Sequence, residues 1–115
     1  MSASVFKVSE TGTGRVDASM TVPAGCHYEL LSVTLHLNAA GTTSEDFTIT
    51  LDANAGHVYD ALLYSVDLSA ASTTDVVWVP SGPWPLILEG GDAVDVAWFN
   101  TEGRTYGVEI TMGAV

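Results

Sequence analysis

The chain is 115 residues long, 47% hydrophobic and 15% charged, with 14 acidic residues against three basic ones, Lys7, Arg15 and Arg104. A chain of this length and apolar content is expected to fold around one core, which excludes a largely disordered protein. The net charge of −11 argues against nucleic acid and anionic membranes as partners, because phosphate groups are bound by clustered lysine and arginine.

Hydrophobic and polar residues alternate along most of the chain, and clusters of Gly, Pro, Asn, Asp or Thr interrupt the alternation. This two-residue period predicts β-strands, and no segment predicts a convincing helix. The expected strands, in chain order, cover residues 5–8, 15–22, 28–37, 47–51, 58–68, 76–79, 86–88, 94–98 and 106–112. The segment 58–68 is the least regular of them, and its centre at 61–63 also fits one turn of helix.

The alternation also predicts which side chains face the core, because successive residues of a strand point to opposite faces. Four hydrophobic residues of the strand at 28–37 are expected to point inward: Leu31, Val33, Leu35 and Leu37. A second set, in the segment 58–68, is expected to share one face: Leu62, Tyr64, Val66 and Leu68. Acidic residues are expected at outward positions, where they keep a β-rich protein soluble: Asp46, Asp52, Asp67, Asp95 and Glu109.

About eight or nine strands without a helix predict an all-β fold, an antiparallel β-sandwich of the jelly-roll type with about eight strands. Residues 15–115 are expected to form this single domain. Residues 1–14 are polar and rich in Gly and Thr after Phe6, so we expect an N-terminal arm that contributes at most an edge strand.

Residues for catalysis or metal binding are not arranged in recognisable motifs. Cys26 is the only cysteine, which excludes an intrachain disulfide and a cysteine-rich zinc site. No GxSxG motif is present, and none of the histidines has metal-ligand spacing: His27, His36 and His57. The acidic runs at 52–54 and 89–92 could supply calcium ligands, but ordinary hairpin turns explain them better. We therefore expect no enzyme activity and no cofactor or metal site.

The three tryptophans divide into two groups. Trp78 and Trp98 lie in apolar or alternating segments and are expected in the core. Trp84 lies between Pro83 and Pro85 on a stiff segment, where holding it in place on binding requires little ordering. We interpret it as an interface anchor or as a plug over one end of the sandwich, in preference to a sugar-stacking platform. Phe6, Pro83, Trp84 and Pro85 are the candidate interface residues.

Two short segments carry a resemblance to a known group of proteins. Residues 21–25 (TVPAG), followed by the strand that begins at Tyr28, resemble the start of many small jelly-roll proteins encoded by tailed bacteriophages. Residues 86–94 (LILEGGDAV) resemble a hairpin that those proteins share with the trimeric C1q and tumour-necrosis-factor-like domains. The resemblance covers about residues 16–112 and transfers no catalytic residue.

The resemblance implies a virion structural protein, above all a head decoration or cement protein that binds the major capsid protein or another virion protein. It also implies a homo-oligomer, with a trimer favoured, located on the capsid surface. The N-terminal sequence has no basic region followed by an apolar one, so we expect synthesis in the host cytoplasm without a secretion signal. The alternatives are a carbohydrate- or receptor-binding module of a tail or fibre, in which Trp84 and Tyr64 stack on a sugar, and a glycosidase with two carboxylates in a cleft.

Overall fold

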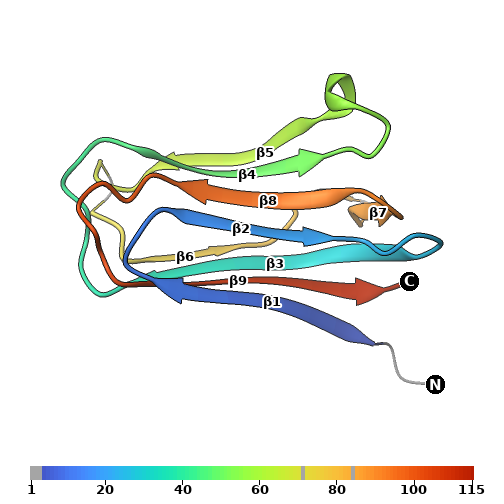
Figure 1. Cartoon of the computed structure of the whole chain (residues 1–115), viewed down its shortest axis with the longest axis horizontal. Helices are drawn as coiled ribbons and strands as arrows, with labels where there is room; N and C mark the ends of the chain where they lie inside the picture. Colours follow the sequence, from blue (N-terminus) through green and yellow to red (C-terminus); the bar gives the residue numbers. More distant parts are fainter. Residues whose placement is uncertain (1–3, 71, 84) are drawn as a thin grey trace.

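Two antiparallel β-sheets packed face to face make up the computed structural model, which describes residues 4–70, 72–83 and 85–115 (Figure 1). Within these residues the chain forms nine strands, one turn of 3-10 helix and no α-helix. The elements are β1 (Val5–Gly12), β2 (Val16–Thr21), β3 (His27–Leu37), β4 (Asp46–Asp52), η1 (His57–Tyr59), β5 (Ala61–Asp67), β6 (Asp75–Trp78), β7 (Ile87–Glu89), β8 (Ala93–Trp98) and β9 (Tyr106–Ala114). The predicted all-β sandwich is confirmed.

The order of the strands is that of a jelly roll. One sheet, here called sheet A, has the order β1-β9-β3-β6, with β7 also paired to β3, and the other, sheet B, has the order β2-β8-β4-β5. The antiparallel partners are therefore nested: β1 with β9, β2 with β8, β3 with β6 and β7, and β4 with β5. A long hairpin wound into two sheets gives this nesting, with β6 and β7 sharing one position, so the jelly-roll prediction is correct.

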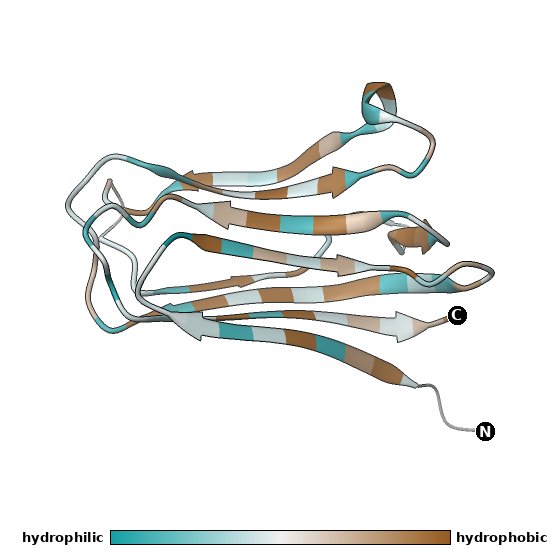
Figure 2. Ribbon diagram, viewed as in Figure 1, coloured by the Kyte–Doolittle hydropathy of each residue, from teal (hydrophilic) through white to brown (hydrophobic). Residues whose placement is uncertain are grey.

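Alternation of hydrophobic and polar residues places the core between the two sheets, as the colours along the strands of Figure 2 show. In β2, Val16, Ala18 and Met20 are buried while Asp17 and Ser19 are exposed. Each fully buried aliphatic or aromatic side chain contributes about 1.5–3 kcal/mol to folding. The largest buried side chains include Phe47, Leu30, Leu35, Leu37, Ile49, Leu68, Leu88, Ile110 and Met112.

One predicted core position in β3 is wrong because the strand contains a β-bulge. The register with β9 shifts between Leu30 and Ser32, so Leu31 has no partner of its own. Leu30 is buried and faces the core, whereas Leu31 lies on the outer face, where a Cβ at Gly113 would be 3.4 Å from its Cδ1. A bulge inserts one residue and reverses the inward–outward phase on one side of it.

A second bulge corrects the prediction for β5. Its register with β4 shifts so that Ile49 pairs with Tyr64 and Thr50 with Leu62, which leaves Leu63 as the extra residue. Leu63 and Tyr64 both pack against the core, and Leu62 is 63% exposed rather than sharing a face with Tyr64. The helical turn also lies earlier than the predicted position at 61–63, in η1, and β5 begins after it.

Candidate interaction surfaces

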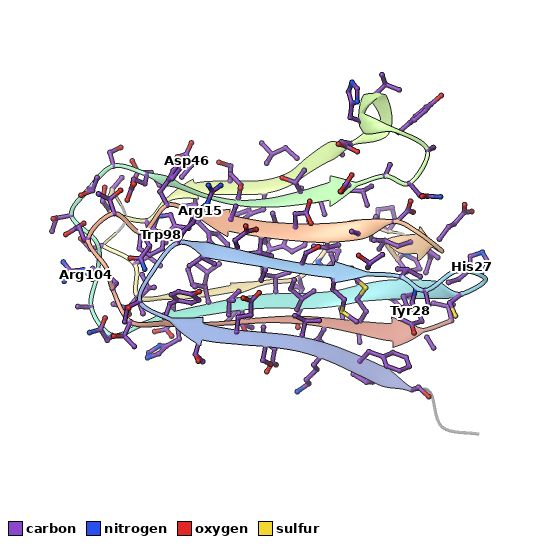
Figure 3. All side chains as sticks on the ribbon, in the orientation of Figure 1. Arg15, His27, Tyr28, Asp46, Trp98 and Arg104 are labelled. Carbon is purple, nitrogen blue, oxygen red and sulfur yellow. The ribbon has the colours of Figure 1, made fainter. Side chains whose placement is uncertain are left out.

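The loops of the sandwich gather at two ends, which we name after one residue each. The Asn100 end carries the loops 13–15, 38–45, 68–74 and 99–105, and the Gly90 end carries the loops 22–26, 53–60 and 90–92. Figure 3 shows Arg15, Asp46 and Arg104 at the first end and His27 and Tyr28 at the second.

Polar side chains bind the loops of the Asn100 end to one another. Glu102 accepts hydrogen bonds from Thr42 N (2.5 Å), Thr42 Oγ1 (2.8 Å) and Thr43 N (2.6 Å). These bonds, first the one from the Thr42 hydroxyl, lower the pKa of Glu102 to about 2. Asn100 is 4% exposed, and its amide donates to Gly14 O (2.7 Å) and Arg104 O (2.9 Å) while its oxygen accepts from Arg104 N.

The Gly90 end is closed by the two turns that carry the sequence resemblance. Gly91 N donates to Val22 O and Val22 N donates to Asp92 O, both at 2.8 Å. Gly90 lies so close to the other turn that a Cβ would be 2.9 Å from Pro23 O and from Gly25 N. Only glycine permits this approach, so residues 21–25 and 86–94 form one structural unit although about 60 residues separate them.

Phe6 and the two prolines, which are three of the four candidate interface residues, lie apart in the structure. Phe6 lies in β1 at one edge of sheet A, 38% exposed, and stacks on Tyr28 with ring centroids 4.9 Å apart. Pro83 and Pro85 are exposed in the segment between β6 and β7, at the opposite edge of the sheet, where they line a hollow of about 410 Å³. Trp84 lies outside the described residues. Phe6 and the two prolines thus lie at two different edges of sheet A.

The exposed edge of β1 offers backbone groups as well as side chains. Ser4 O accepts a hydrogen bond from Ala114 N, so the even-numbered residues of the adjoining strand direct their backbone groups toward β9. The odd-numbered residues then direct theirs away from the sheet: Val5, Lys7, Ser9 and Thr11. An unpaired edge of this length is a template for another strand.

Histidines and carboxylates do not assemble a metal site. Among the described residues, no group of three or more His, Cys, Asp or Glu side chains could hold a metal ion. His36 Nδ1 lies 2.5 Å from Asp75 Oδ1, a hydrogen bond that lowers the pKa of Asp75. The two residues pair across β3 and β6 on the outer face of sheet A.

The tryptophan predictions hold for Trp98 and in part for Trp78. Trp98 is 2% exposed. Trp78 is partly buried against the core and stacks on Tyr64 at a centroid distance of 6.1 Å. Tyr64 is itself partly buried against the core.

Phe99 is an exposed aromatic residue beside charged groups, and the sequence did not point to it. Phe99 is 61% exposed, and Arg15 lies over its ring at 4.8 Å from the centroid. Both line a hollow of about 540 Å³ together with Glu45 and Asp46. Glu45 is held there by hydrogen bonds from the nitrogen and hydroxyl of Thr101.

The sequence also did not single out the tip formed by residues 53–62, which follows β4 and contains η1. All three residues of η1 are exposed, and no residue of this turn is buried. The sequence placed Val58 and Tyr59 in a strand, but Gly56, with a φ of 125°, turns the chain just before them.

Comparisons with known proteins add little to this description. No protein-family model matches the chain, and no curated protein matches its sequence. Among solved structures, the acidic stable capsid of Helicobacter pylori bacteriophage KHP30 aligns over 97% of this chain and 94% of that one, with 12% identity and a TM-score of 0.48. Within residues 4–70, 72–83 and 85–115, no helix is long and apolar enough to cross a membrane. The jelly-roll assignment therefore rests on the strand order of the chain itself.

Proposed function

We propose that the chain is a non-enzymatic structural protein of a bacteriophage virion, a decoration or cement protein that stabilises the head through protein–protein contacts. The observation that carries the proposal is the packing of the two resembling segments into one unit, in which Gly90 lies against Pro23 and Gly25. These segments resemble those of small phage jelly-roll proteins, and their contact within a jelly-roll strand order supports a shared design rather than two unrelated turns.

The exposed edges of the sheets supply the contacts for such a role. The outward backbone groups of β1 and the half-exposed ring of Phe6 are one candidate contact, and the proline segment with Pro83 and Pro85 is another. A protein that buries these surfaces across neighbouring capsid subunits stabilises the assembled state by mass action, because it binds that state and not the separated subunits.

The distribution of charge gives the docked protein an orientation. The outer face of sheet B carries five aspartates and no lysine: Asp17, Asp46, Asp52, Asp67 and Asp95. This face is suited to water, whereas the outer face of sheet A has a smaller net charge, because it carries Lys7 beside four acidic residues: Glu29, Asp75, Glu89 and Glu109. We propose that sheet A and its edges face the capsid and that sheet B faces outward.

A homo-oligomer, with a trimer favoured, and binding to the major capsid protein are parts of the same proposal. Sedimentation velocity of the purified chain tests the first, with a mass of three 12.0-kDa chains as the expected result. The second is tested by co-sedimentation with heads of the phage that encodes the chain. We expect saturable binding and heads that resist heating better. Heads that neither bind the chain nor gain stability contradict the proposal.

A sugar-binding module is the second candidate, and the hollow around Phe99 is the observation that favours it. An exposed aromatic ring beside Arg15 and Asp46 combines apolar contact with hydrogen-bonding groups, the usual composition of a small-ligand site. A glycan array followed by titration calorimetry tests it. Saturable binding of a glycan that Phe99→Ala abolishes, with no binding to heads, would put this function first.

A further inference from the structure

The tip of residues 53–62 carries three exposed hydrophobic residues within five positions of the sequence. Val58 is 76% exposed, Tyr59 is 65% exposed and Leu62 is 63% exposed. Figure 1 shows η1 projecting outward beyond the ends of β4 and β5, away from the core. Single exposed hydrophobic residues are ordinary on protein surfaces, whereas neighbouring ones on a projecting loop are typical of an interaction site.

Hydrogen bonds fix the shape of the tip although it buries no apolar side chain. Gly56 N donates to Ala53 O (3.1 Å), Tyr59 N to Gly56 O (3.0 Å) and Asp60 N to His57 O (3.1 Å). Asp60 Oδ1 accepts from Ala53 N at 2.8 Å, which closes the base of the loop. A surface that is ordered before it meets a partner loses less conformational entropy on binding.

A further bond connects the tip to the unit that closes the Gly90 end. Asn54 N donates to Asp92 Oδ1 at 2.9 Å, and Asp92 Oδ2 accepts from Glu89 N at 3.0 Å. The bulge at Leu63 shapes the other side of the loop. It turns Leu63 inward and leaves Leu62 facing outward, three residues after Tyr59. The exposed cluster is thus a product of the fold.

The charges around the tip are all negative. Asp52 precedes the tip and Asp60 lies within it, both of them exposed, and Asp92 is bonded to it. No lysine or arginine occurs between Arg15 and Arg104 in the sequence. An acidic border of this kind repels a phosphate surface and attracts lysine and arginine side chains.

A second copy of the chain is a poor occupant for the tip, because its cations already have partners. Lys7 Nζ lies 3.5 Å from Glu109, Arg104 Nη2 lies 3.0 Å from Glu102, and Arg15 lies over Phe99. With these three the chain has no further lysine or arginine to place against the tip of a second copy.

We propose that the tip docks into a basic protein surface, an apolar pocket that receives Val58, Tyr59 and Leu62 and is bordered by lysine or arginine side chains facing Asp52 and Asp60. The inference rests on the proposed function only in taking the partner to be a protein. It names a surface that the virion role does not require, since that role was assigned above to sheet A and its edges.

Site-resolved binding of defined peptides tests the proposal. The 15N-labelled chain is titrated at physiological ionic strength with a synthetic peptide of alternating lysine and leucine, and with a lysine–serine peptide of the same charge. We expect the amide shifts caused by the lysine–leucine peptide to concentrate in residues 52–62, and the lysine–serine peptide to bind more weakly. Shifts centred on the part of the outer face of sheet B that lies outside residues 52–62, or on the edges of sheet A, overturn the proposal.

Exposed-residue variants separate the tip from general charge attraction. The double variant Val58→Ser with Tyr59→Ser is expected to weaken binding of the lysine–leucine peptide at least about tenfold, whereas Val77→Ser, an equally exposed valine on sheet A, is expected to leave it unchanged. Asp52→Asn with Asp60→Asn is expected to weaken it more than Asp17→Asn with Asp46→Asn on sheet B. Equal effects within either pair overturn the proposal.

Other occupants give different results in the same experiments. If the tip binds neutral phosphatidylcholine vesicles in place of the peptide, or if the Val58 and Tyr59 variant breaks a homo-oligomer in sedimentation velocity, a protein partner of basic charge is the wrong assignment. Head binding together with peptide shifts that stay away from residues 52–62 overturns the tip and leaves the virion role standing. Peptide shifts at the tip without any binding to heads support the tip and overturn the virion role.

Discussion

Hydrogen bonds hold the loops together at both ends of the sandwich, but the two ends differ in the apolar residues that they expose. At the Asn100 end, the carboxylate of Glu102 and the amide of Asn100 bind neighbouring loops, and at the Gly90 end Asp92 binds the tip. Both ends are therefore held by hydrogen bonds within the chain. The Gly90 end also carries a projecting loop whose apolar side chains are exposed, Val58 and Tyr59 among them.

The difference teaches that order and burial are separate properties of a loop. Internal hydrogen bonds can fix a loop without any contribution from the hydrophobic effect, and this leaves its apolar side chains free for another molecule. We expect the hydrogen bonds of the Asn100 end to act on stability, and the Gly90 end to act on stability at its base and on recognition at its tip.

Asn100→Ala is the change expected to have the largest effect on the Asn100 end. It removes the side-chain amide that donates to Gly14 O and Arg104 O. Because Asn100 is only 4% exposed, these oxygens are left without partners in a buried position, which is destabilising. Asn100 also has a φ of 53°, which alanine adopts with strain. We expect the free energy of unfolding to fall by about 3 kcal/mol in urea denaturation.

Asn100→Gly separates the two causes, since glycine adopts a positive φ without strain. Compared with Asn100→Ala, it is expected to recover only the part of the lost stability that comes from backbone strain. Full recovery of stability by glycine means that the hydrogen bonds of Asn100 contribute little, and the comparison between the two ends then fails for this residue.

Gly90→Ala tests the base of the Gly90 end. The added methyl would lie 2.9 Å from Pro23 O and Gly25 N, which are backbone atoms that cannot move aside without displacing the turn. We expect a loss of about 2 kcal/mol, as for other overpacked sites. Gly14→Ala is the matched control, because a Cβ there meets nothing within 4 Å. Equal stabilities of the two variants would show that the turns do not pack in solution as described.

The sequence predicted the strands well and the bulges not at all. In β2 a two-residue period runs without interruption, so each inward residue is identified correctly. In β3 and β5 the runs Leu30–Leu31 and Leu62–Leu63 place two leucines side by side, and the period cannot tell which of them is the extra residue. That choice depends on the register with the partner strand, which is a tertiary property.

Leu63→Ala and Leu62→Ala measure the consequence of the second bulge. Leu63 packs against the core and Leu62 is 63% exposed. We expect a loss of about 1–1.5 kcal/mol for Leu63, less than for a fully buried leucine, and a change within about 0.5 kcal/mol for Leu62. The sequence alone predicts the opposite order. If thermal or urea denaturation gives that order, the bulge lies at a different residue.

The candidate surfaces were harder to predict than the fold. The stiffness of Pro83 and Pro85 is a local property, and the sequence could point to it. The exposure of Val58 and Tyr59 depends on a turn at Gly56 and on a bulge at Leu63, and neither has a signal in the hydrophobic pattern. Acidic residues on both sides of an apolar run, Asp52 and Asp60 here, were the only hint that the run is exposed.

Glu102→Gln is expected to have the smallest effect on stability of these variants, and its signature is a dependence of that effect on pH. The hydrogen bonds from Thr42 and Thr43 lower the pKa of Glu102 to about 2, against an ordinary value of 4.5. Because the folded state binds this proton less readily than the unfolded state, the ionised carboxylate stabilises the fold above pH 4.5, and this contribution is lost as the pH falls toward 2. The midpoint of thermal unfolding of the variant should therefore lie below that of the parent at neutral pH, and the difference should vanish near pH 2.

Thr42→Val provides the control for the cause of that pH dependence. It removes the hydroxyl that donates to Glu102 Oε2 and keeps the backbone donors of residues 42 and 43. We expect the pKa of Glu102, followed by NMR of its side-chain carboxyl carbon, to rise in this variant toward its ordinary value, because the hydroxyl bond is the largest cause of the shift. The carboxylate is in contact with water, where ionic interactions are weak, so the loss of stability should be smaller than for Asn100 or Gly90. A pKa near 4.5 in the unmodified chain would mean that the loops of the Asn100 end are held by Asn100 rather than by Glu102.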